Sequence, residues 1–133
     1  MTIADYEAAI CGRWNKAKKV PFKPVSLEGW QPEASKCHEN VDIWVRENEN
    51  SGYFAERGWI NSYNIFQGIR LTAHSVVKAP DGRLFDITPL LDERLRATTR
   101  FVPHIGSDEC FFAIKEKSIF IDCQKGEADP LQR

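Results

Sequence analysis

The sequence lacks an excess of charge of either sign. Its 133 residues contain 18 lysines and arginines and 19 aspartates and glutamates, so the net charge at neutral pH is −1. A chain so balanced has no broad electrostatic attraction for nucleic acid or for an anionic membrane surface. We therefore expect neither nucleic acid nor a membrane among its partners.

Long apolar runs are also absent. No stretch approaches the roughly 20 apolar residues that a membrane-spanning helix needs, and no hydrophobic signal-peptide segment follows Met1. The sequence has no internal repeat or low-complexity tract, and its length suits one hydrophobic core. These features predict a cytoplasmic protein with a single domain over residues 1–133, which includes an N-terminal helix (1–19) and a polar tail (124–133).

Cysteine pairs at short spacing are missing. The four cysteines are Cys11, Cys37, Cys110 and Cys123, and none of them form the Cys-x-x-Cys spacing of zinc ribbons or thioredoxin-like sites. Because disulfides are rare in a reducing cytoplasm, all four are expected to be thiols. Cys11, Cys110 and Cys123 are expected to be chemically silent apolar residues. Cys37 lies in a different context.

The first part of the chain has the apolar spacing of helices. Residues 4–18 are predicted to form an amphipathic helix. The connector 20–32 contains three prolines and a glycine and is expected to be extended. A second helix is expected to begin near Ser35, a good N-cap residue. Its apolar face would be formed by Cys37, Val41, Trp44 and Val45.

The later part changes to the alternating pattern of strands. The strands are expected at 52–61, 69–78 and 84–88. The Asp81-Gly82 turn would join the last two. Residues 90–101 fit either a short helix or an irregular crossing, and residues 110–123 are predicted to be a hairpin that turns at 115–117. Helices followed by antiparallel strands predict an α+β fold, in which a central helix carrying the cysteine packs on a sheet of about five strands.

Three chemically reactive side chains occupy defined places in this scheme. Cys37 lies in the first turn of a helix, His74 in the middle of a strand, and Asp86 in the strand that returns from the tight turn. A thiol titrates near 8.5, so a nucleophilic cysteine needs a helix N-terminus or an imidazolium to ionise near neutrality. A carboxylate behind the imidazole orients it and stabilises its charge. Pairing of Val77–Lys78 with Leu84–Phe85 would make Asp86 a diagonal neighbour of His74.

An acyl-transfer site also needs hydrogen-bond donors for the oxyanion. The backbone N–H of Cys37 is one candidate, and the side-chain amide of Gln31, six residues earlier, is the other. Asn40 is expected to bond the connector. The candidate cleft residues are Trp30, His38, Trp59 and His104.

The order of these residues resembles a known group. Cysteine at a helix start, then histidine and an acid on adjacent strands, is similar to the papain-like cysteine proteinase fold, in which a glutamine precedes the cysteine by six residues, as Gln31 does here. Papain itself has tryptophan after the cysteine, where this chain has His38. Three strings resemble the N-terminal glutamine amidohydrolases of the same broad fold: Cys37-His38-Glu39-Asn40-Val41, His74-Ser75-Val76-Val77 and Phe85-Asp86-Ile87. The resemblance implies a Cys-His-Asp triad and cleavage of an amide.

Each of these residues also has a non-catalytic interpretation. Cys37 fits the buried face of a helix, His74 fits a core or surface position, and Asp86 fits a turn-closing role. A conceivable set of zinc ligands is Cys37, His38, His74 and Cys110. This metal site is disfavoured, because Cys37 and His38 are adjacent in the predicted helix and their side chains would point about 100° apart.

The combined pattern predicts a thiol-dependent hydrolase or acyl transferase. Cys37 would attack the amide, His74 would act as base and acid, and Asp86 would orient His74. The expected partner is a small-molecule, peptide or protein amide, and no cofactor is expected because nucleophile and base are internal. The alternative is a non-catalytic α+β binding or interaction domain that keeps the fold, with Cys37 as a packing residue.

Overall fold

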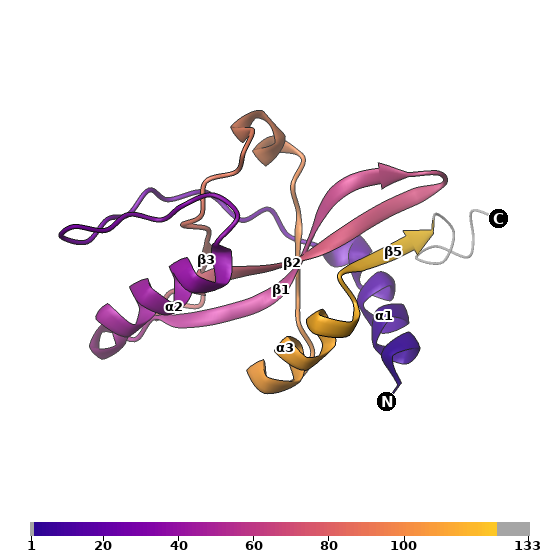
Figure 1. Cartoon of the computed structure of the whole chain (residues 1–133), viewed down its shortest axis with the longest axis horizontal. Helices are drawn as coiled ribbons and strands as arrows, with labels where there is room; N and C mark the ends of the chain where they lie inside the picture. The colour runs from indigo at the N-terminus through magenta and orange to yellow at the C-terminus, as the bar shows by residue number, and fades with distance from the viewer. Residues whose placement is uncertain (1, 125–133) are drawn as a thin grey trace. The chain divides into compact units, whose positions relative to one another are not determined.

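The computed structural model describes residues 2–124 and confirms the α+β class (Figure 1). The helices are α1 (Ile3–Gly12), α2 (Cys37–Glu47) and α3 (Asp108–Lys117), with short 3-10 helices η1 (Trp14–Lys16), η2 (Glu49–Ser51) and η3 (Glu93–Ala97). The strands are β1 (Phe54–Ile65), β2 (Gly68–Lys78), β3 (Leu84–Phe85), β4 (Phe101–Pro103) and β5 (Phe120–Gln124). Of the predicted polar tail, Gln124 ends β5, and residues 125–133 lie outside the described residues.

The described strands form a sheet in the order β3-β2-β1-β4, and β5 also pairs with β2. The β1–β4, β2–β3 and β2–β5 pairs are antiparallel. The predicted tight turn joins β2 to β3, and Gly82 adopts there the positive φ of 90° that glycine tolerates best. Val77 lies opposite Phe85, as predicted.

The chain divides into two compact units. Among the described residues, the first comprises 2–18, 58–73 and 100–124, and the second comprises Lys19–Arg57 and His74–Thr99. Strands β1 and β2 each contribute residues to both. The largest buried side chains of the first core are Tyr6, Trp59, Phe111, Ile10, Leu71 and Ile121. The second core is formed by Val41, Trp44, Val77, Phe85 and Ile87.

Helix α1 of the first unit is capped at its start and shorter than predicted. The Thr2 hydroxyl accepts the N–H of Asp5 (3.0 Å), and the Asp5 carboxylate accepts the N–H of Thr2 (3.1 Å), which is a capping box. The helix ends at Gly12 rather than at residue 18, because the chain tightens into η1 and becomes extended at Ala17.

Helix α3 replaces the hairpin predicted for residues 110–123, so that prediction is wrong. The Ser107 hydroxyl caps the helix by accepting the N–H of Cys110 (3.1 Å). Acidic residues in the first turn and lysines in the last turn both favour the helix dipole. Phe111 anchors the buried face. Only the end of the predicted hairpin is a strand, β5, and it pairs with β2.

A disulfide joins Cys11 on α1 to Cys123 on β5, so the prediction that both are thiols is wrong. Figure 1 shows α1 beside β5, and the two Cα atoms lie 5.4 Å apart, within the range of a disulfide. The false hairpin hid this pairing, because it placed Cys123 opposite Cys110 instead. Cys110 is an exposed free thiol on α3 rather than a buried apolar residue.

In the second unit, α2 begins at Cys37 and not near Ser35. Ser35 has a φ of 67°, and Lys36 occupies the N-cap position without a side-chain capping bond. The N–H of Cys37 therefore belongs to the first turn, where backbone donors have no acceptor within the helix. Val41 and Trp44 bury the predicted apolar face.

The strand predicted for residues 84–88 is shorter, because β3 ends at Phe85. At the next residue the backbone turns to a different partner. The N–H of Asp86 donates to the Pro21 carbonyl (2.8 Å), and its carbonyl accepts the N–H of Lys23 (2.8 Å). The proline-rich connector is therefore held directly beside Asp86.

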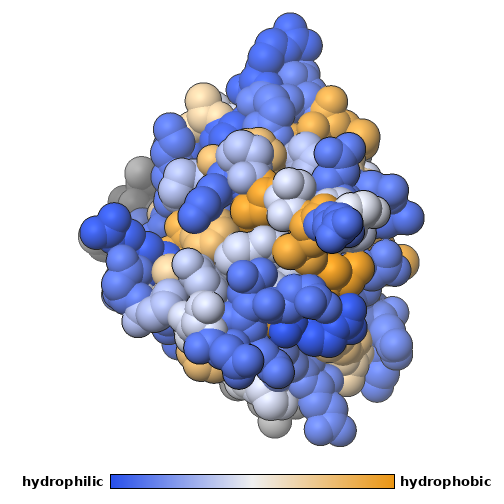
Figure 2. Space-filling view, turned by 90° about the vertical axis from the view of Figure 1, so that its left-hand side faces the viewer, coloured by the Kyte–Doolittle hydropathy of each residue, from blue (hydrophilic) through white to orange (hydrophobic). Residues whose placement is uncertain are grey.

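Hydrophobic side chains are sparse on the face shown in Figure 2, where small apolar patches lie between hydrophilic residues. The large hydrophobic residues that are exposed are Phe54, Phe66, Leu91, Leu95, Ile119 and Phe120. Scattered exposure of this kind is ordinary in folded proteins. Between residues 2 and 124, no helix is both long and apolar enough to cross a bilayer.

Loss of the disulfide is expected to destabilise the protein. The cross-link spans 112 residues, and its removal restores entropy to the unfolded chain, which lowers the free energy of unfolding by about 2–4 kcal/mol. Cys11→Ser and Cys123→Ser should lower Tm equally in calorimetry, as should dithiothreitol, whereas Cys110→Ser should leave Tm unchanged. Thiol titration of the unfolded, unreduced protein should find two thiols; four would contradict the bridge.

Candidate active site

Three elements of the second unit carry the predicted triad. Cys37 opens α2, His74 lies in β2, and Asp86 directly follows β3. His74 and Asp86 are 5% and 3% exposed, whereas Cys37 is partly exposed. A partly accessible sulfur backed by buried titratable groups suits a reactive cysteine.

Asp86 is fully engaged by hydrogen bonds. Its Oδ2 lies 2.8 Å from His74 Nε2 and accepts a bond from Arg96 Nη1 (2.6 Å), while its Oδ1 accepts the N–H of Thr88 (3.0 Å). Burial raises the pKa of Asp86, but the nearby His74, the Thr88 N–H and Arg96 lower it by more, so the pKa falls below its ordinary value. The carboxylate is therefore ionised beside the imidazole.

The ring of His74 is also close enough to the sulfur of Cys37 to shift the pKa of both groups. Since Nε2 faces Asp86, Nδ1 is the ring nitrogen left for the sulfur. Burial raises the pKa of Cys37, but hydrogen bonds and charges from His38 and His74 outweigh it and lower the pKa to about 5. Burial lowers the pKa of His74, but Asp86 and Cys37 raise it to about 10. Between these values the pair is a thiolate and an imidazolium.

Arg96 belongs to this site and is missing from the sequence-based prediction. It lies on η3, and its side chain is only 12% exposed. Besides Asp86, its guanidinium bonds the Thr88 carbonyl (3.1 Å) and Glu93 Oε2 (2.8 Å). An arginine in a segment of mixed charge gives no local indication that it will be buried, and the unresolved prediction for 90–101 left its position open.

Asn40 ties α2 to Glu33, the residue that directly follows the connector predicted for 20–32. Its Nδ2 donates to the Glu33 carbonyl (2.8 Å) and to Thr88 Oγ1 (3.0 Å), and its Oδ1 accepts the Glu33 N–H (3.2 Å). Asn40 is 2% exposed. Because Glu33 follows Gln31 closely in the chain, this contact restrains the segment that carries the predicted oxyanion donor.

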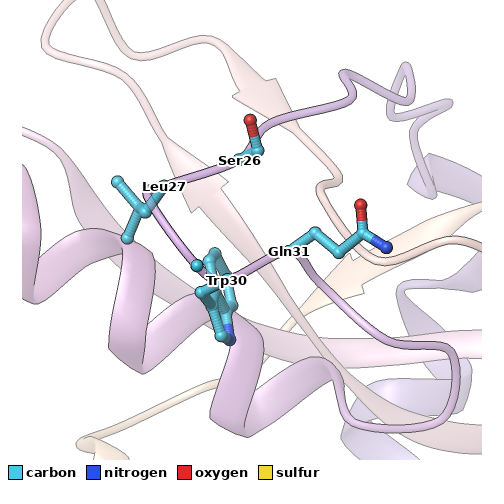
Figure 3. Close-up of a pocket in the computed structure, with 5 residues that line it drawn as sticks. Ser26, Leu27, Trp30 and Gln31 are labelled. Carbon is cyan, nitrogen blue, oxygen red and sulfur yellow. The ribbon is translucent and has the colours of Figure 1, made fainter.

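Gln31 is exposed on the connector and lines an open pocket of about 410 Å³. The other lining residues are Ser26, Leu27, Gly29 and Trp30. Figure 3 shows the Gln31 amide extending away from the Trp30 ring, and Trp30 packs against the core of the second unit. The amide is thus open to an incoming group, and its role as oxyanion donor stays a prediction.

His38 is anchored on the side away from solvent. Its Nδ1 lies 2.6 Å from Ser75 Oγ, and Ser75 Oγ accepts a bond from Arg57 Nη1 (2.8 Å). The same ring is close enough to the Cys37 sulfur to lower the pKa of that thiol. His38 therefore contacts the proposed nucleophile rather than only lining a cleft.

The other two candidate cleft residues lie in the first unit, where Trp59 is a core residue, so the assignment of Trp59 to a cleft is corrected. Trp59 has no exposed surface, and its Nε1 donates to the Tyr6 hydroxyl (2.9 Å). His104 Nδ1 lies 2.6 Å from that hydroxyl, and its Nε2 lies 2.8 Å from the Ser107 carbonyl oxygen. Alternation along β1 does not distinguish a core tryptophan from a cleft tryptophan, which explains the error.

The part of the chain that the structure describes contains no group of three or more His, Cys, Asp or Glu side chains placed to hold a metal ion. The four residues considered as zinc ligands do not come together as such a group. His74 and His38 are instead engaged with Asp86 and Ser75.

Comparisons with known proteins gave no match, whether with family models, curated proteins or solved structures. A function for this chain has to be argued from the chemistry of the site.

The acidity of Cys37 leads to a direct prediction for its alkylation. In Cys110→Ser protein, the iodoacetamide rate should follow the thiolate fraction and level off by about pH 6, one unit above the pKa of about 5. His74→Gln should move the profile to higher pH, because the imidazolium is lost. Intact-mass measurements across pH test this, and Cys37→Ala in the same Cys110→Ser protein reports any alkylation at other residues. A rate that rises only above about pH 8 would contradict it.

Proposed function

We propose that the protein is a papain-like cysteine hydrolase or acyl transferase that cleaves an amide bond through an acyl-Cys37 intermediate. One observation carries the proposal: the buried His74 ring bonds the Asp86 carboxylate and interacts with Cys37, so that the pKa of the thiol is about 5 and that of the imidazole about 10. Burial alone would shift both pKa values in the opposite directions. A packing role for Cys37 does not account for this reversal.

The first half-reaction forms the acyl-enzyme. The Cys37 thiolate attacks the carbonyl carbon, so that a C–S bond forms and the carbonyl electron pair moves onto the oxygen. When the tetrahedral intermediate collapses, the C–N bond breaks and the leaving nitrogen takes the proton of the His74 imidazolium. The products are a free amine or ammonia, a thioester on Cys37 and a neutral His74.

The second half-reaction releases the acyl group. His74 removes a proton from water or from an acceptor nucleophile, whose oxygen or nitrogen attacks the thioester carbonyl. Collapse of this intermediate breaks the C–S bond and returns Cys37 as a thiolate beside protonated His74. Asp86 is ionised beside the imidazolium, since His74, the Thr88 N–H and Arg96 lower its pKa by more than burial raises it, and it stabilises the imidazolium at both stages.

The oxyanion would be held by two donors. The Cys37 N–H lies in the first turn of α2, where it has no helical acceptor and where the helix dipole favours negative charge. The exposed Gln31 amide would supply the second bond. The bonds between Asn40 and Glu33 support this arrangement, because they limit the movement of the connector.

An activated ester tests the acyl-enzyme directly. With p-nitrophenyl acetate, Cys110→Ser protein should release a burst of nitrophenolate and carry one acetyl group on Cys37 by peptide mapping. Cys37→Ala should give neither. Peptides that begin with glutamine should then be tested as amide substrates for release of ammonia. Without a burst or a Cys37 adduct, the alternative of a non-catalytic binding domain would be preferred.

Asp86→Asn is expected to impair turnover of the acyl donor by a factor on the order of ten to a thousand. The asparagine keeps the size and can still bond the ring, but it removes the charge that raises the pKa of His74. The pKa of Cys37 should rise with it. Steady-state kinetics and the ultraviolet absorbance of the thiolate measure the two effects.

Arg96→Gln is the matched control for lost packing around Asp86. It removes a buried partner of the carboxylate and should lower the free energy of unfolding by about 1–3 kcal/mol, yet it leaves the contact between His74 and Asp86 in place. We therefore expect the thiolate to persist at low pH in Arg96→Gln and not in Asp86→Asn. Equal titration curves for the two variants would remove Asp86 from the mechanism.

A further inference from the structure

A second imidazole reaches the Cys37 sulfur, and its environment differs from that of His74. His38 follows Cys37 in the first turn of α2, and its Nδ1 lies 2.6 Å from the hydroxyl oxygen of Ser75. Arg57 Nη1 donates to that oxygen (2.8 Å), while Arg57 Nη2 donates to Asp42 Oδ1 (2.6 Å). Ser75 is 0% and Arg57 is 6% exposed.

The direction of these hydrogen bonds follows from what each group can do. Arginine can only donate, so the Ser75 oxygen accepts from Arg57. The hydroxyl hydrogen of Ser75 then needs an acceptor, because the side chain is fully buried. Within residues 2–124, the one other partner of this hydroxyl is His38 Nδ1. That nitrogen must therefore accept, and the proton of the neutral ring lies on Nε2.

The two histidines therefore differ in the groups that bond their rings. His74 faces the carboxylate of Asp86, which favours the protonated ring. His38 instead meets the hydroxyl of Ser75, behind which lies the positive charge of Arg57. Two neighbouring imidazoles that are held by different partners can take different tasks in catalysis.

We propose that His38 is a second catalytic histidine, a neutral imidazole whose Nε2–H donates a hydrogen bond to the Cys37 thiolate while His74 carries the proton. This inference rests on the function proposed above. A hydrogen bond from His38 is among the interactions that lower the pKa of Cys37; the neutral ring proposed here would supply that bond but not the charge of His38 that also contributes to the lowering. Arg57 and Ser75 are positioning residues, since they act through the tautomer of His38.

Such a donor has a distinct use in the second half-reaction. Before the water attacks, His74 is neutral and Cys37 is a thioester. The sulfur must then leave as a thiolate, and a hydrogen bond from His38 stabilises the negative charge as it develops there. Loss of His38 should accordingly slow deacylation as well as make the free thiol less acidic.

Two substitutions at the same position separate the two ring nitrogens. His38→Asn places an oxygen near Nδ1 that can accept from Ser75, but it has no group near Nε2. His38→Gln extends an amide donor toward the sulfur. In Cys110→Ser protein, the thiolate absorbance should show the Cys37 pKa raised by about one unit in His38→Asn, a tenfold loss of thiolate below that pKa, and by less than half as much in His38→Gln.

Ser75→Ala tests the same inference without altering either histidine. It removes the donor to Nδ1, so the tautomer with its proton on Nδ1 becomes accessible and the Nε2–H is partly lost. The pKa of Cys37 should rise by an amount between those of the two His38 variants. An unchanged titration in His38→Asn and in Ser75→Ala, with both proteins folded by circular dichroism, would overturn the role of His38.

His74→Gln distinguishes failure of this inference from failure of the proposed function. If His74→Gln raises the pKa of Cys37 and His38→Asn does not, the triad stands and the second histidine is rejected. If His74→Gln leaves the pKa unchanged, the proposed function fails whatever His38 does. Single-turnover hydrolysis of the acetyl-enzyme gives the second readout, in which His38→Asn should slow deacylation about tenfold.

Discussion

The contact between His74 and Asp86 is the constraint on which the site depends. An ionised carboxylate that is 3% exposed is costly unless charged or hydrogen-bonding groups surround it. Here His74, Arg96 and the Thr88 N–H supply those partners. The ionised carboxylate in turn keeps a buried imidazole protonated, and the protonated imidazole keeps the thiol of Cys37 as a thiolate. The Asp86 carboxylate, the His74 imidazolium and the Cys37 thiolate therefore each depend on the opposite charge of a neighbouring group.

Asp86 also organises the chain around it. Its backbone bonds Pro21 and Lys23, and the Arg96 guanidinium that contacts its carboxylate lies 4.8 Å from the centre of the Phe22 ring. One end of the proline-rich connector is thus fixed at Asp86, and Asn40 fixes the other end. The residue at the electrostatic centre of the site is therefore also the anchor of the loop that bears the predicted oxyanion donor.

Local signals were sufficient for some elements and not for others. The β2–β3 hairpin and its register follow from the turn at Gly82, and the apolar face of α2 follows from helical spacing. Residues 110–123 are rich in aromatic and branched side chains, which favoured a hairpin, although Ser107 followed by two acidic residues is a helix start. Arg96 and the partner of Cys11 depend on contacts between segments distant in sequence. Neither has a local signature, so neither could be found before the fold was known.

The disulfide between Cys11 and Cys123 closes most of the polypeptide into a covalent ring, and residues 19–57 and 74–99 lie entirely within that ring. A single proteolytic cut at any loop inside the ring opens it but does not separate the fragments. The nicked protein keeps its mass apart from one added water, and it runs as one species in denaturing electrophoresis until a reductant is added. Denaturing electrophoresis therefore detects a single backbone cleavage inside the ring only after the disulfide has been reduced.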